Sequence, residues 1–160
     1  MRTLERRMAM GYEAATKVYL ATGKFQRMVH LFRVTPRGEE SAVGLLKADT
    51  LEEDMVIVEG VAAGYKPDFA LFVSEADVAD KEVDGPLLAQ PVRSVAFTIQ
   101  GWERARPERS VWLIAKIVKV DTDAGQVTTL ASPTFKESEY VEGGDTNLLR
   151  DALVRAQGKE

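Results

Sequence analysis

The spacing of apolar side chains along the chain predicts three helices. In residues 4–21 apolar side chains recur at helical intervals, after a capping Thr3 and before Gly23, which suits a left-handed helix end. A capping box that starts at Thr50 predicts a second helix, which ends at Gly64. The β-branched run 56–58 favours a strand, so helix and partial strand both stay open for residues 51–63. We expect a third helix over about residues 146–157, capped by Asp145.

The segments between these helices are typical of strands. Apolar side chains alternate on one face from Met28 to a turn at 35–38, and residues 41–48 are typical of a returning strand. Together they predict a hairpin. Residues 69–73 are apolar on both faces, as in a central strand, and an acidic loop is expected after them. Residues 93–102 alternate and predict a half-buried strand, which pairs with residues 110–120 across the loop 103–109. A turn at 121–125 leads to a short strand that ends near Leu130, and we expect residues 131–144 to be irregular.

The order of these elements, α-β-β-α-β-β-β-β-α, predicts the fold class. Because hairpins dominate it, we expect an α+β protein with a mainly antiparallel sheet of about six strands and three helices. A length of 160 residues suits a single domain over 1–160. Three helices are too few to cover both faces of such a sheet completely. Either the C-terminal helix crosses to the second face, or a second copy of the chain covers that face.

Composition excludes several classes of function. The chain has no Cys and only one His, His30, which excludes disulfides, thiolate metal sites and two-His metal sites within one chain. A net charge of −4 argues against extensive nucleic-acid binding. No apolar run approaches the ~20 residues of a membrane span, and the first residues lack the apolar stretch of a signal peptide. We therefore expect a cytoplasmic protein without membrane contact.

Two charged segments are candidate sites. Glu75, Asp77 and Asp80 follow the central strand and could hold a divalent cation, although their spacing fits no calcium loop and a solvated loop is the simpler interpretation. The second segment combines an indole with guanidinium groups, which suits stacking on a nucleotide, although a solvated hairpin loop is the simpler interpretation. Its candidate residues are Trp102, Arg104, Arg106 and Arg109. His30, between Met28 and Phe32 on one strand face, is typical of a hydrogen-bonded core or edge residue.

The segment Phe72-Val73-Ser74-Glu75-Ala76 resembles a strand motif, roughly vfvSEaW, of small uncharacterised bacterial and phage-type α+β proteins. The resemblance spans about residues 25–120, and Asp77 stands where the motif has an aromatic residue. It implies a topology, and it marks Ser74 and Glu75 as candidate ligand-binding positions without implying a mechanism.

Together these observations favour a small non-enzymatic binding or regulatory protein, for example one encoded by a phage or an accessory genome. It would act through contact with a macromolecule or by sequestering a small ligand, and it would need no cofactor. The alternatives are a metal-assisted hydrolase that uses Glu75, Asp77 and Asp80, and nucleotide binding at the loop 102–109. Only the hydrolase would need a divalent metal.

The distribution of charge also predicts a homodimer. Residues 91–119 carry a net +4, whereas residues 72–90 carry −4 and residues 134–145 carry −3. Charge segregation of this kind, together with a strand that is apolar on both faces, suits a two-fold interface with complementary rims. We expect Trp112 or Ile114 in the core of that interface.

Overall fold

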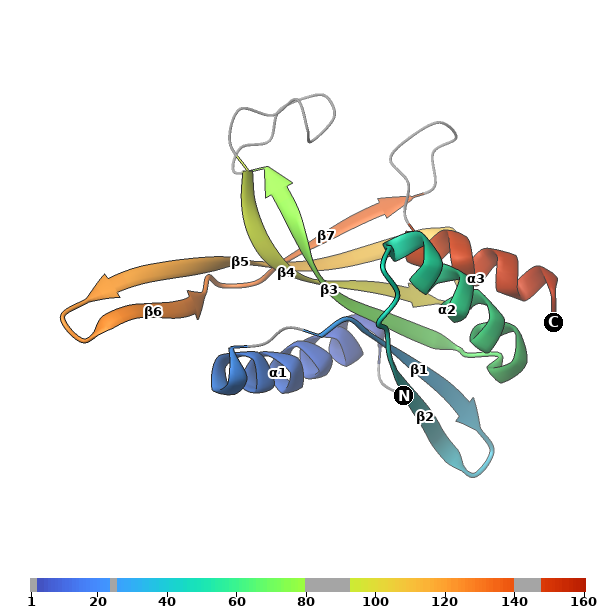
Figure 1. Cartoon of the computed structure of the whole chain (residues 1–160). Helices are drawn as coiled ribbons and strands as arrows, with labels where there is room; N and C mark the ends of the chain where they lie inside the picture. The colour runs from blue at the N-terminus through green and yellow to red at the C-terminus, as the bar shows by residue number, and fades with distance from the viewer. Residues whose placement is uncertain (1–2, 24–25, 80–92, 140–147) are drawn as a thin grey trace.

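The computed structural model of the chain describes residues 3–23, 26–79, 93–139 and 148–160, and it forms one antiparallel sheet with three helices (Figure 1). The strands lie in the order β2-β1-β3-β4-β5-β6, and β7 pairs with β5. The α+β prediction is thereby confirmed. In chain order the elements are α1 Leu4–Thr22, β1 Met28–Thr35, β2 Gly38–Leu45, α2 Leu51–Tyr65, β3 Phe69–Ala79, β4 Arg93–Glu103, β5 Arg109–Thr122, β6 Gly125–Leu130, β7 Thr134–Glu139 and α3 Leu148–Gly158.

The ends of α1 and α2 follow from local capping. The Thr3 hydroxyl accepts a hydrogen bond from Arg6 N at 3.2 Å, and Gly23 adopts φ 68° where α1 ends. The Thr50 hydroxyl accepts from Glu53 N at 3.2 Å, and the whole of α2 is helical, which excludes the strand alternative. α2 ends at Tyr65 rather than at the predicted Gly64, because Lys66 takes the left-handed position at φ 57°.

Several strand predictions need correction because strand ends depend on pairing partners distant in sequence. The returning strand β2 covers 38–45 rather than 41–48. β3 continues to Ala79 beside β4, so Glu75 and Asp77 lie on a strand and not in a loop. The segment expected to be irregular contains β7, which pairs with Arg109–Ile114. β4 is buried on both faces where Thr98 and Gln100 lie, so it is not half-buried there.

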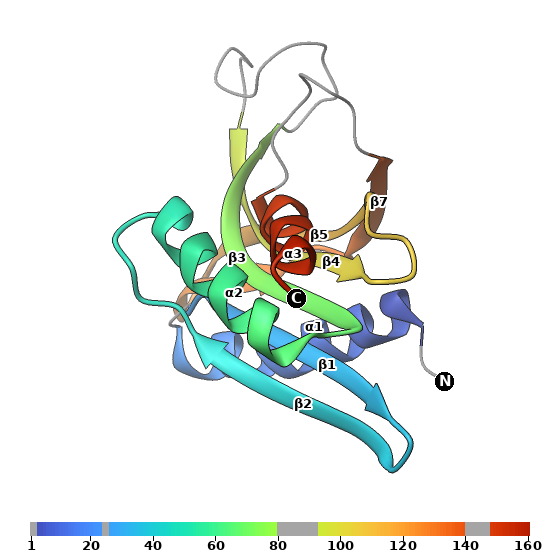
Figure 2. The ribbon, with the colours of Figure 1, turned by 90° about the vertical axis from the view of Figure 1, so that its right-hand side faces the viewer.

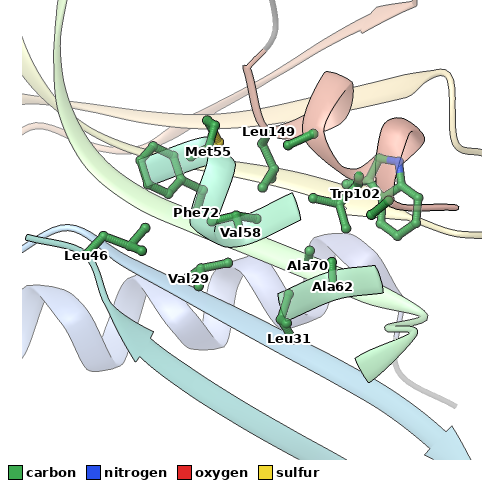
Figure 3. Close-up of a cluster of buried hydrophobic side chains, with 13 residues drawn as sticks. Val29, Leu31, Leu46, Met55, Val58, Ala62, Ala70, Phe72, Trp102 and Leu149 are labelled. Carbon is green, nitrogen blue, oxygen red and sulfur yellow. The ribbon is translucent and has the colours of Figure 1, made fainter. Parts of the chain in front are cut away.

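The helices divide between the two faces of the sheet (Figures 1 and 2). α2 and α3 pack together on one face, where their apolar side chains meet Phe72 and Trp102 (Figure 3). α1 lies alone on the opposite face, where Leu4 and Met8 meet β4 at Gly101 and Tyr12 packs edge-on against Phe97. The C-terminal helix therefore shares its face with α2, and the first helix covers part of the second face, over β3 and β4.

β5 is longer than its neighbours and joins two parts of the structure. Its first half lies between β4 and β7, whereas Ile117–Thr122 pair with β6. This second half and β6 form a two-stranded arm that projects beyond α1 (Figure 1). We refer to residues 117–130 as the arm.

Candidate functional site

A cleft lies between α1 and the β1–β2 hairpin. α1 packs on β3 and β4, so the same face of β1 and β2 is left open beside it. The cleft has a volume of about 1300 Å³, larger than the ~300–1,000 Å³ typical of small-molecule sites. It is therefore large enough for a ligand of the size of a metabolite or drug.

The walls of the cleft are mainly apolar. Met10, Ala14 and Val18 lie one turn apart on α1 and form one wall, and Val43 on β2 lies opposite. Val18 is 60% exposed and Val43 is 58% exposed, so both apolar side chains remain in contact with water. Solvent-exposed apolar walls of this kind favour an apolar ligand.

The floor of the cleft is set by how closely α1 approaches the sheet. Leu71, Val73 and Phe97 are buried beneath it. A Cβ at Gly11 would lie 3.1 Å from Leu71 Cδ1, so glycine at this position lets the helix rest directly on β3. This close contact fixes the distance between α1 and the sheet and hence the depth of the cleft.

His30 places a polar atom on the floor. Its ring stacks on Phe32 with centroids 4.0 Å apart and an interplanar angle of 29°. Its Nε2 is buried and has no hydrogen-bond partner among the described residues. Burial lowers the pKa of His30 below 6.5, an effect that the nearby Glu39 carboxylate partly offsets, so the imidazole is neutral at pH 7. The sequence predicts a hydrogen-bonded core or edge residue, and at Nε2 the structure shows no such bond among the described residues.

Ion pairs fix the ends of the cleft. At one end, the buried Arg7 pairs with Glu39 of β2, and its guanidinium lies 3.8 Å from the Phe69 ring centroid. At the other end, Arg27 pairs with the buried Asp54 at 2.8 Å, and Asp54 also accepts a hydrogen bond from Ala48 N. Arg7 and Arg27 thus have protein partners at the two ends of the cleft.

The structure gives the residues of the predicted nucleotide site other roles. Trp102 is 0% exposed, and its indole N–H donates to Pro107 O at 3.0 Å. Arg104 donates to both carboxylate oxygens of Glu160, which raises the pKa of Arg104. Arg109 pairs with Glu5 and Glu103, and Arg106 is exposed. These contacts occupy the ring and two of the guanidinium groups that a nucleotide would need.

The other predicted site residues are dispersed. The buried Ser74 shares a hydrogen bond with Thr98 at 3.1 Å, and the exposed Glu75 lies at the edge of the cleft. Asp77 lies opposite Val95 in the β3–β4 pair, whereas its side chain and all of Asp80 lie outside the described residues. Within the described part of the chain, no group of three acidic or histidine side chains could hold a metal ion.

Trp112 and Ile114 are half-buried on β5, opposite Gln100 and Thr98 of β4. Because paired residues share a face, both lie on the face covered by α2 and α3. The prediction that they form a dimer interface stays a prediction.

Sequence reasoning identified His30 on an apolar strand face but did not identify the cleft. The sequence signal that could have pointed to a binding site was that same alternation, because a single polar ring among apolar neighbours is costly unless something bonds to it.

None of the helices that the structure describes is both long and apolar enough to cross a bilayer. Comparison with family models, with curated proteins and with solved structures found no match to this chain.

Proposed function

We propose that this chain is a small non-enzymatic binding protein that sequesters an apolar small molecule in the cleft between α1 and the β1–β2 hairpin. The observation that carries the proposal is a large apolar cleft whose floor presents a buried polar atom, His30 Nε2, without a hydrogen-bond partner among the described residues. Ligand sites commonly combine these two features, since apolar walls supply affinity and a few polar groups fix orientation.

The chemistry of the cleft favours a ligand with a mainly apolar body and one neutral hydrogen-bonding group. A neutral imidazole can donate or accept at Nε2, so a hydroxyl, amine or carbonyl would satisfy it. A strongly charged ligand fits less well, because Arg7 and Arg27 at the two ends are paired with Glu39 and Asp54. The binding energy would come mainly from apolar surface removed from water.

The position of His30 supports binding rather than catalysis. In hydrolases that use histidine as a base, the imidazole is hydrogen-bonded to a nucleophile and held by a carboxylate. His30 Nε2 has no such partner among the described residues, and its ring is held by stacking on Phe32. This arrangement suits recognition of a ligand group by a single hydrogen bond.

A fluorescence titration tests the proposal. N-phenyl-1-naphthylamine is neutral and apolar, carries one N–H donor, and becomes more fluorescent away from water. We expect saturable binding to the wild-type chain and at least a tenfold weaker affinity for Ala14→Phe, which places a ring on the cleft wall.

The matched control is Ala9→Phe, which adds the same ring to an exposed position of α1 that does not line the cleft. This variant should bind the probe like wild type. Equal weakening by the two variants, or the absence of saturable binding to the wild-type chain, would contradict the proposal.

A further inference from the structure

Three strands, β2, β6 and β7, pair with a neighbour on one side only along their whole length in the described part of the chain, and they differ in charge. β2 carries Glu39 and Glu40, and β7 carries charged residues at 136, 137 and 139. β6 has the sequence Gly-Gln-Val-Thr-Thr-Leu and carries no charge, no proline and three β-branched residues. Charged side chains usually protect edge strands from pairing with other chains, so β6 is the one unprotected edge among these three.

The arm that contains β6 also lacks packing of its own. β6 makes its extensive contacts with β5, and the arm stands apart from the body (Figure 1). Val118, Val120 and Val127 lie on one face of the arm and are 38%, 45% and 50% exposed. A two-stranded hairpin alone is only marginally stable in water, so this arm would gain stability from an additional strand.

We propose that β6 pairs edge to edge with β6 of a second copy of this chain, which joins the two sheets through a four-stranded antiparallel ribbon. A two-fold axis perpendicular to the ribbon keeps each residue on the same face in both copies. In the register that pairs all of residues 126–130 with the same residues of the second chain, Thr128 lies opposite Thr128 of that chain. Val127 would lie opposite Thr129 of the second chain, so the valine face would continue across the junction.

The charges of the arm favour a second copy in the antiparallel orientation. The tip carries Asp121 and Asp123, whereas Lys116 lies at the base, next to the first pair of the arm. Antiparallel pairing brings the acidic tip of one arm alongside the base of the other. Parallel pairing would place the two acidic tips together, at a cost in like-charge repulsion. This inference does not depend on the proposed ligand in the cleft.

Light scattering across a concentration series tests the association. An interface of one short strand is smaller than the ~800 Å² per partner of a stable complex, so we expect the mass to rise from 17.7 kDa toward twice that value between about 5 and 300 μM. Thr129→Lys adds a charge to β6 and should abolish the increase. Thr134→Lys makes the same change at an exposed position of the charged strand β7 and should leave it intact.

Cysteine cross-linking tests the register. The chain has no Cys, so no native thiol can form a competing disulfide. Residues opposite each other in an antiparallel pair have Cα atoms about 4.5–5.5 Å apart, within the range that a disulfide spans. Oxidised Thr128→Cys should therefore run as a covalent dimer, and Thr134→Cys as a monomer.

Either of two results would overturn the inference. One is a mass that stays at that of a single chain across the whole concentration series. The other is a dimer that Thr129→Lys leaves intact and Thr128→Cys does not cross-link, which would direct attention to Trp112 and Ile114 instead.

Discussion

The packing of α1 on the sheet depends on the absence of a side chain at residue 101. Gly101 lies on β4 beneath the first turns of α1. A Cβ there would overlap Met8 Sδ and lie 3.2 Å from Leu4 Cδ1, whereas carbon atoms in contact are about 3.5–4.0 Å apart. Met8 and Leu4 are buried, so neither side chain can move without disturbing its neighbours. We expect Gly101→Ala to destabilise the protein.

The size of the effect follows from two opposing contributions. Overpacking of a filled core costs about 1–3 kcal/mol. Alanine also restricts the unfolded chain, which offsets about 0.4–1 kcal/mol, because the φ of Gly101 is not in the positive range that disfavours a side chain. The net decrease in the free energy of unfolding therefore lies between about 0 and 2.6 kcal/mol, and we expect a value near the middle of that range, about 1.3 kcal/mol.

Urea denaturation followed by circular dichroism measures this difference. Gly101→Ala should lower the midpoint without changing the slope. Gly60→Ala is the control, because a Cβ at that position of α2 meets no atom within 4 Å and should stabilise the helix by about 0.5–1 kcal/mol. In a Met8→Ala background most of the penalty at residue 101 should be relieved, because the Met8 Sδ and Cε atoms are gone and only the closer-than-normal contact with Leu4 Cδ1 remains. A penalty that persists unchanged in that background would refute the steric explanation.

Three further predictions concern the Arg27–Asp54 ion pair at one end of the cleft, the cap of α2, and His30 on the floor of the cleft. Arg27→Met leaves the buried Asp54 carboxylate without its ion-pair partner and should lower the free energy of unfolding, measured by urea denaturation, by about 3–5 kcal/mol. Adding Asp54→Leu to the same chain should restore part of that loss. Thr50→Ala removes the cap of α2 and should lower the free energy of unfolding by about 0.5–2 kcal/mol, which urea denaturation detects as a lower midpoint. Because folding lowers the pKa of His30, the unfolded chain binds more protons below pH 6.5, so the stability of wild type relative to His30→Phe should fall as pH decreases through that value. A constant difference across pH 5–8 would contradict the burial of the imidazole.

The helices could be predicted closely from the sequence because their signals are local. Thr3, Gly23 and Thr50 each act within one turn, and both helix starts are where capping places them. Strand ends were less predictable, because a strand continues as far as its neighbour pairs with it. β7 exists because residues 134–139 lie beside the first half of β5, and nothing in their own polar sequence indicates that partner.

The candidate site could be predicted only in part, because it forms between elements that are distant in sequence. The alternation around His30 placed the ring on an apolar face, but the cleft depends on α1 resting on β3 at Gly11. The indole and arginines of the loop 102–109 suggested a binding surface from composition alone. In the structure Trp102 is part of the core and Arg104 pairs with Glu160, because tertiary contacts decide whether such side chains face solvent.

The most direct test of the proposed function uses the fact that His30 is the one histidine of the chain. Its ring gives a single set of imidazole resonances, which can be followed by NMR during titration with N-phenyl-1-naphthylamine. Binding in the cleft predicts that these resonances shift and saturate at the same probe concentration as the fluorescence, and that the shift is lost in Ala14→Phe. Saturation of the fluorescence while the His30 resonances stay unmoved would contradict the account.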